Sequence, residues 1–87
     1  MKLLWHEQAW ADYLYWQTQD KKTLKKINAL LTDTMRNPFD GTGKPEPLKH
    51  YKGYWSRRID EANRITYKVT EEYILILSVR GHYEDLA

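Results

Sequence analysis

Cysteine is absent from this 87-residue chain, which excludes both a disulfide framework and a thiol nucleophile. The three histidines, His6, His50 and His82, follow no spacing used by zinc sites, so we expect neither a metal nor another cofactor. No apolar run approaches the length of a membrane span, and residues 2–5 are too short for the apolar core of a signal peptide. These absences predict a cytoplasmic protein without membrane contact.

The length predicts a single domain over residues 1–87. The net charge is only +2, but residues 41–68 carry seven basic residues against three acidic ones. Tyrosine and tryptophan alternate with these bases, as on surfaces that neutralise phosphates and stack nucleobases. A solvated sheet face would have the same composition, and charge alone leaves the two interpretations even. The basic residues are Lys44, Lys49, Lys52, Arg57, Arg58, Arg64 and Lys68.

Apolar periodicity predicts a short strand at residues 2–5, followed by two helices. The first helix spans residues 7–18, and we expect its stripe to face the core. Asp20 is a candidate N-cap for the second helix, which ends by Asn37 because Pro38 disfavours helical geometry in the residue before it. The short gap between the two helices predicts an antiparallel helical hairpin. The first stripe consists of Trp10, Tyr13, Leu14 and Gln17, and the second of Leu24, Ile27, Leu30, Leu31 and Met35.

Residues 37–47 contain three prolines and two glycines and are predicted to form a loop. Glu46 lies between two of the prolines, so its carboxylate is either an accident of a polar loop or a positioned catalytic group. The loop taken alone favours the accident. Three strands rich in aromatic and β-branched residues follow, at 54–59, 64–69 and 73–80.

Strand parity predicts which side chains share a face, because alternate residues point to opposite sides of a sheet. An apolar face that includes Trp55 and Tyr67 places Arg58 directly opposite Arg64 on the other face. Pairing Tyr67 with Leu75 puts Leu75, Leu77 and Val79 on the core side. Ser78, Arg80 and His82 then join the two arginines, and Arg57 falls on the core side without an explanation. Directly opposed arginines repel, and a bound anion would relieve that repulsion.

The order of these motifs resembles the YoeB toxins of the RelE superfamily, and the resemblance covers nearly the full chain. The matching segments are Trp5, residues 10–16, Asn37-Pro38-Phe39, residues 43–49, residues 55–59, residues 63–67 and the Gly-His-Tyr at 81–83. The resemblance implies an α+β fold of order β-α-α-β-β-β. In that fold the helical hairpin packs on one face of a twisted, mainly antiparallel sheet.

The resemblance also implies a function: a type II toxin that enters the decoding site of the 30S ribosomal subunit and cleaves mRNA without a metal. Glu46 would be the general base, His82 the general acid and Arg64 the phosphate stabiliser, while Tyr83 would help to orient the nucleotide or the proton transfer. Lys49 and Arg58 would contact RNA phosphates. A YefM-type antitoxin would cover the site, and the sequence leaves homodimer formation open.

This chain departs from the family pattern in the tail 84–87 and in a turn at 51–53 that is one residue shorter. The acidic tail would either weaken RNA binding or fray into solvent. His6 and His50 are interpreted as surface residues without a catalytic role. Two rival functions remain on the same fold. One is a non-catalytic ParE-like toxin that inhibits gyrase, and the other is an RNA-binding module whose activity has decayed.

Overall fold

The computed structural model describes residues 1–82, so Tyr83 and the predicted tail 84–87 lie outside the described residues. The elements follow the predicted order, with one additional two-residue strand inside residues 37–47, where only a loop was expected. They are β1 (Lys2–Trp5), α1 (Glu7–Gln19), α2 (Lys21–Arg36), β2 (Glu46–Pro47), β3 (Tyr54–Arg58), β4 (Arg64–Val69) and β5 (Tyr73–Ser78).

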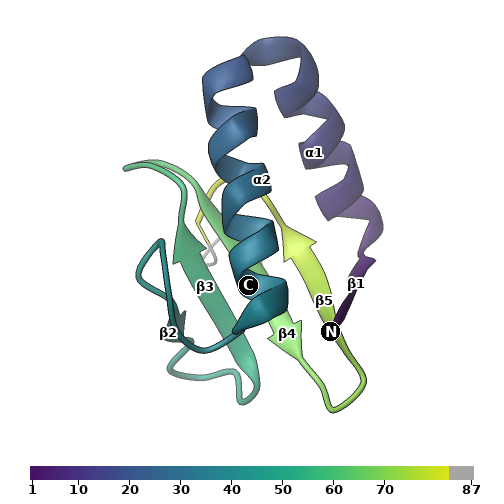
Figure 1. Cartoon of the computed structure of the whole chain (residues 1–87), viewed down its shortest axis with the longest axis vertical. Coiled ribbons are helices and arrows are strands. Elements are labelled where there is room, and N and C mark those ends of the chain that lie inside the picture. The colour runs from purple at the N-terminus through teal and green to yellow at the C-terminus, as the bar shows by residue number, and fades with distance from the viewer. Residues whose placement is uncertain (83–87) are drawn as a thin grey trace.

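The two helices form a hairpin that covers one face of a five-stranded sheet (Figure 1). The strand order is β1-β5-β4-β3-β2. β1 runs parallel to β5, and the other neighbouring strands are antiparallel. The predicted α+β class and the mainly antiparallel sheet are confirmed.

The helical hairpin turns at Asp20, as predicted. The Asp20 carboxylate accepts hydrogen bonds from the backbone N–H groups of Lys22 at 3.0 Å and Thr23 at 3.3 Å, and from the Thr23 hydroxyl at 2.7 Å. These bonds, led by that from the hydroxyl, hold the pKa of Asp20 below its ordinary value. His6 caps α1 in a similar way, since its Nδ1 accepts the Gln8 N–H at 3.1 Å. Both helix starts are therefore fixed by local side-chain bonds.

The register between β3 and β4 is the predicted one. Arg58 lies opposite Arg64, and Trp55 lies opposite Tyr67. Tyr67 is fully buried beneath the helices, so the paired arginines belong to the other face of the sheet.

The register between β4 and β5 differs from the prediction. Tyr67 lies opposite Ile76 rather than Leu75, and a β-bulge leaves Leu77 without a partner in β4. Ile74 and Ile76 consequently face the helices and are fully buried, whereas Leu75 and Leu77 are only half-buried. The prediction of Leu75 and Leu77 as core residues is wrong, because the extra residue of the bulge reverses the parity.

Beyond the bulge the predicted parity returns. Ser78 lies opposite Thr66, on the face that carries Arg64, and Val79 is fully buried on the helix side. One bulge thus supplies a core of isoleucines before it and a polar row after it.

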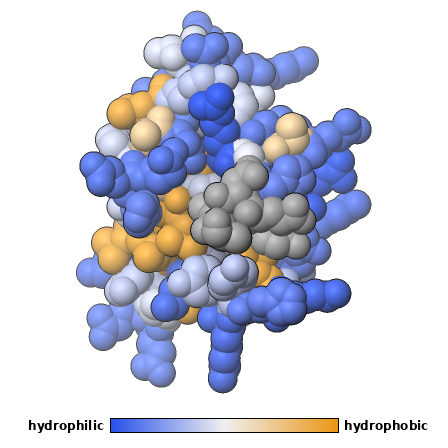
Figure 2. All heavy atoms as spheres, turned by 180° about the vertical axis from the view of Figure 1, so that it is seen from behind, coloured by the Kyte–Doolittle hydropathy of each residue, from blue (hydrophilic) through white to orange (hydrophobic). Residues whose placement is uncertain are grey.

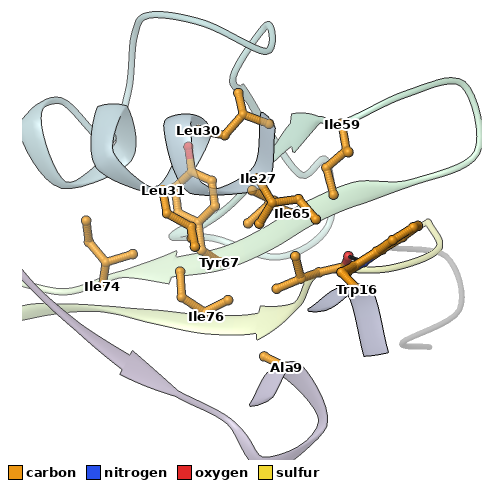
Figure 3. Close-up of a cluster of buried hydrophobic side chains, with 11 residues drawn as sticks. Ala9, Trp16, Ile27, Leu30, Leu31, Ile59, Ile65, Tyr67, Ile74 and Ile76 are labelled. Atoms are coloured by element: carbon orange, nitrogen blue, oxygen red, sulfur yellow. Dashed lines mark hydrogen bonds between the residues drawn. The ribbon is translucent and has the colours of Figure 1, made fainter. Parts of the chain in front are cut away.

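The hydrophobic core lies between the helices and the sheet, where side chains of α1 and α2 meet those of β4, β5 and the residue that follows β3 (Figure 3). Ile27, Leu30 and Leu31 of α2 are buried as predicted, while Met35 is partly exposed. Within residues 1–82 no helix combines the length and apolarity needed to cross a bilayer. The core residues are Ala9, Trp16, Ile27, Leu30, Leu31, Ile59, Ile65, Tyr67, Ile74, Ile76 and Val79.

Helix α1 is rotated relative to its prediction. Ala9, Asp12 and Trp16 are its buried residues, whereas Trp10 and Leu14 are 47% and 45% exposed. The predicted apolar stripe therefore lies mostly in solvent. Spacing at three and four residues also describes the buried set, so periodicity alone could not choose between the two faces.

Candidate active site

The segment 37–47, which we call the loop arm, is anchored by Arg57. This arginine is fully buried on the helix side of β3, where its Nη1 forms an ion pair with Asp33 at 2.8 Å. Its Nε donates to the Tyr67 hydroxyl at 3.2 Å. Its remaining bonds go to backbone carbonyls of the loop arm, those of Asn37, Asp40 and Thr42. The core-side arginine that the sequence left unexplained is therefore the donor that fixes this loop.

Asp33 ties the same loop arm from α2. Its Oδ2 accepts the Thr42 N–H at 2.8 Å and the Thr42 hydroxyl at 3.1 Å. The Thr42 N–H, followed by the Arg57 guanidinium, lowers the pKa of Asp33. Gly43 follows with a φ of +78°, and a Cβ there would lie 2.8 Å from Leu30 Cδ2. The loop arm passes too close to α2 to carry a side chain at this point.

Glu46 leaves the loop arm as part of the edge strand β2. It pairs with Ser56 of β3, and Pro47 pairs with Trp55. Proline is tolerated here because an edge strand can lack one N–H donor. The expectation of a loop throughout residues 37–47 is thus wrong at its last two positions, where backbone pairing fixes Glu46 against the sheet.

Glu46 and Arg64 meet on the sheet face opposite the helices. Arg64 Nη1 donates to Glu46 Oε1 at 3.0 Å and to Ser56 Oγ at 3.3 Å. The Arg64 side chain is 22% exposed and that of Glu46 54%, so the pair is open to a ligand. Parity placed Ser56 on this face, but nothing in the sequence indicated its contact with Arg64.

A row of buried hydroxyls lies beneath this pair. Ser56, Thr66 and Ser78 are cross-strand neighbours and are 0%, 0% and 3% exposed. Ser78 Oγ donates to the Arg80 carbonyl at 3.2 Å. Within residues 1–82, Thr66 Oγ1 is the one buried side-chain oxygen or nitrogen without a hydrogen-bond partner. The site therefore has a polar floor. On the side of the molecule seen in Figure 2, hydrophilic side chains form the rim and an apolar patch lies toward the centre.

Residues 79–82, which we call the C-terminal arm, bring His82 towards Arg64. The Gly81 carbonyl accepts the Arg64 N–H at 2.9 Å, and the Gly81 N–H donates to Asn63 Oδ1 at 2.9 Å. The exposed His82 follows directly. The guanidinium of Arg80, expected beside Arg64, instead lies over the Tyr15 ring of α1 at 3.6 Å from its centroid. The predicted role of Tyr83 falls outside the described residues.

The two predicted phosphate contacts are both exposed. Arg58 lies opposite Arg64 and donates through Nε to the Asp60 carbonyl at 3.4 Å. Lys49 lies in the turn after β2, three residues beyond Glu46. Among the described residues Arg64 is paired with a carboxylate and Arg58 is not. This leaves a cation beside the Glu46–Arg64 pair.

This face combines the Glu46 carboxylate with the Arg64 guanidinium, which the buried Ser56 hydroxyl supports, and the backbone just before His82 is hydrogen-bonded to the backbone of Arg64. A carboxylate can accept a proton, and a guanidinium can bind an anion. Within residues 1–82 no three histidine, aspartate or glutamate side chains gather as a metal site.

Residues 5–83 match the family model described as "YoeB-like toxin of bacterial type II toxin-antitoxin system". The chain belongs to the YoeB family. Toxin YoeB of Escherichia coli K12 is 58% identical over 84 residues, covering 95% of this chain and 100% of that protein. Toxin YoeB of a Synechocystis species is 51% identical over 85 residues, covering 97% of this chain and 99% of that protein. The resemblance found in the sequence is confirmed.

Solved structures agree with this assignment to the YoeB family. A YoeB/ParE toxin from Agrobacterium tumefaciens superposes with a TM-score of 0.90 at 44% identity, covering 95% of this chain and 100% of that one. YoeB in a heterotetrameric YoeB–YefM complex from Staphylococcus aureus gives 0.84 at 45% identity, covering 95% and 98%. YafQ from Escherichia coli, at 20% identity and a TM-score of 0.78 over 99% and 98%, shares the fold.

Proposed function

We propose that this YoeB-family toxin is a metal-independent endoribonuclease that cleaves mRNA in the decoding site of the ribosome. The observation that carries the proposal is the bond between Glu46 and Arg64. A carboxylate 3.0 Å from a guanidinium on an open sheet face can act on a group that the guanidinium binds. RNA offers such a pair, a phosphodiester with a neighbouring 2′-hydroxyl.

In the proposed reaction, Glu46 removes the proton from the ribose 2′-hydroxyl as the 2′-oxygen attacks phosphorus. Arg64 stabilises the negative charge that accumulates on the phosphoryl oxygens. The bond from phosphorus to the 5′-oxygen breaks, and His82 donates a proton to that oxygen. The products are a 2′,3′-cyclic phosphate and a 5′-hydroxyl. Tyr83 would orient the nucleotide.

The Glu46–Arg64 ion pair is the resting arrangement in this mechanism. When a phosphate takes the guanidinium, the carboxylate is released as a base beside the phosphate it must help to cleave. Ser56 keeps Arg64 on this face during the exchange, since its oxygen accepts from the same Nη1. Arg58 and Lys49 would bind the flanking phosphates.

The proposed partners follow from the same face and from the relatives. The ribosome and its mRNA would place the toxin in the cytoplasm. YoeB of Staphylococcus aureus has been solved with YefM and as a dimer. For this chain we propose a YefM-type antitoxin that covers the basic face. We also propose that the toxin forms a homodimer, as that relative does.

Primer extension on mRNA from cells that express the toxin tests the reaction. Wild-type toxin should give codon-positioned cuts, and Glu46→Gln should abolish them. Glu61→Gln is the matched control, because Glu61 is an exposed carboxylate in the turn before β4. Growth arrest without cuts, equal in wild type and Glu46→Gln, would favour a ParE-like toxin. RNA binding without cuts or arrest would favour a decayed RNA-binding module.

A further inference from the structure

Val79 begins the C-terminal arm at the point where the chain leaves the sheet. β5 ends at Ser78, whose partner is Thr66, and Val79 is fully buried on the helix side. A buried backbone N–H and C=O need hydrogen-bond partners, and β4 provides neither at this position. Something outside the sheet must therefore satisfy both groups.

Helix α1 provides both partners through side chains. Asp12 Oδ2 accepts the Val79 N–H at 3.0 Å, and Trp16 Nε1 donates to the Val79 carbonyl at 2.8 Å. The two side chains lie four residues apart, on one face of the helix, and Trp16 reaches the end of β5 (Figure 3). They imitate the two bonds that a neighbouring strand would make.

Asp12 is an unusual residue to bury in a helix whose only role is to pack on the sheet. Asp12 is 5% exposed, while the apolar Leu14 of the same helix is 45% exposed. Among the described residues the two ion pairs are Arg57–Asp33 and Arg64–Glu46, so Asp12 is buried without a cationic partner. Its other oxygen accepts from Gln8 Nε2 at 2.9 Å. Burying a carboxylate among neutral donors costs free energy, which its hydrogen bonds to Val79 and Gln8 must offset.

The fixed Val79 is three residues from His82. The intervening Arg80 lies over Tyr15 of α1, and Gly81 is bound by Asn63 and by the backbone of Arg64. The C-terminal arm is therefore held first by α1 and then by the segment that carries Arg64. The bonds at Val79 and those at Gly81 together set where His82 starts.

We propose that Asp12 and Trp16 are positioning residues that set the C-terminal arm, so that His82 reaches a phosphate bound at the Glu46–Arg64 pair. This inference rests on the proposed nuclease function and adds a role for α1 in it. A displacement of a catalytic group by about 1 Å can lower a rate about 10²-fold.

Single-turnover cleavage of mRNA on ribosomes tests the proposal with Trp16→Phe, which keeps a ring but removes the N–H donor, and with Asp12→Ala. Each should lower the maximal rate about 10- to 100-fold, while the toxin concentration for half-maximal rate changes less than about twofold. Asp12→Asn keeps one oxygen acceptor and should recover most of the rate. Gln17→Ala, on the exposed side of α1, is the control and should leave the rate unchanged.

A double-mutant cycle with His82→Gln separates positioning from stability. If α1 acts through His82, adding Trp16→Phe to His82→Gln should lower the rate less than about twofold. Full multiplicative losses with His82→Gln would overturn the proposal. Folded Trp16→Phe and Asp12→Ala proteins that cleave at the wild-type rate would also overturn it.

The two hydrogen bonds from Asp12 and Trp16 to the Val79 backbone, which we call the clamp, can be tested without cleavage by amide hydrogen exchange at Val79. Asp12→Ala should accelerate exchange at Val79 at least about tenfold relative to Ile76 within β5. Unchanged protection would count against the clamp. A wild-type toxin that fails to cleave on ribosomes would instead count against the proposed function, and the exchange result would stand independently.

Discussion

The loop arm carries Glu46 to the sheet face opposite the helices and the C-terminal arm leads to His82, but the two arms are held by buried charges of opposite sign. Arg57 donates to the Asn37, Asp40 and Thr42 carbonyls of the loop arm. Asp12, with Trp16, binds both backbone groups of a single residue, Val79. The comparison shows that the type of backbone group left without a partner, carbonyl or N–H, determines which buried side chain holds the segment.

The loop arm has backbone carbonyls without backbone partners, because prolines remove three of its N–H donors and its path is irregular. A guanidinium, with five N–H groups in a planar fork, satisfies several carbonyls at once. The C-terminal arm leaves β5 at Val79, where one backbone N–H and one backbone carbonyl have no partner in the sheet. A carboxylate oxygen and an indole N–H are sufficient there.

Removing Arg57 should have the largest effect on stability. Arg57→Met should lower the free energy of unfolding by about 3–5 kcal/mol, because a buried ion-pair partner and several carbonyl bonds are lost together. Arg57→Lys should recover part of this, since an ammonium can keep the Asp33 bond but not the whole set. Urea unfolding measures both. Arg58→Met, on the exposed side of the same strand, should stay within about 0.5 kcal/mol of wild type.

Asp12→Ala should destabilise the protein less than Arg57→Met, by about 1–3 kcal/mol, since only two hydrogen bonds are lost. The comparison between the arms would be broken if the two substitutions had equal effects on unfolding. It would also be broken if Arg57→Met left the loop arm intact, as judged by amide protection at Thr42.

A glycine substitution separates backbone conformation from crowding in the loop arm. Gly43→Ala should lower stability by about 2–3 kcal/mol, because it combines a φ of +78° with a Cβ 3.1 Å from the Arg58 carbonyl. Gly53→Ala is the matched control at a φ of +86°, where the nearest atom, the Val69 carbonyl oxygen, lies 3.9 Å away. It should show the conformational part alone, about 1 kcal/mol. Equal losses would mean that crowding at Gly43 does not constrain the loop arm.

Much of the fold could be predicted, because periodicity and punctuation are local signals. The helical hairpin, the Asp20 cap and the Arg58–Arg64 register follow from spacing and parity. The β4–β5 register does not, because residues 73–77 are apolar at both parities and either face could be buried. A bulge depends on which backbone bonds the rest of the fold can satisfy, and no local pattern encodes that.

The candidate site divides in the same way. Parity placed Arg64 and Ser56 on one face, and the family resemblance singled out Glu46. The anchors were missed, because their roles depend on backbone groups far away in the sequence. Arg57 appeared as an exception on the core side, and Asp12 was masked by the more apolar stripe beside it. A charged residue that interrupts an apolar face was the available signal in both cases.

Acidification should weaken the loop arm through Asp33. Its pKa is lowered in the folded protein, so its stabilising effect is complete above its ordinary value of 3.8 and is lost as the pH falls through the lower folded value. Wild type should therefore exceed Asp33→Asn in stability at pH 6, and the difference should shrink at pH values below 3.8. Asp20 titrates similarly in both proteins and cancels. A difference that stays constant between pH 6 and pH 3 would show that Asp33 does not hold the loop arm as a carboxylate.

The smallest effect should come from Arg80, which sharpens the account of the C-terminal arm. Its guanidinium is exposed over the Tyr15 ring, an arrangement that stabilises by about 0.5–1 kcal/mol. Arg80→Gln should lower the free energy of urea unfolding by no more than this and should leave Val79 amide protection unchanged. If Arg80→Gln instead matched Asp12→Ala in both measurements, stacking on Tyr15 would be the main hold on the arm. The backbone clamp at Val79 would then be secondary. The parallel with Arg57 would fail, because the unpaired backbone groups would no longer explain which side chain holds the arm.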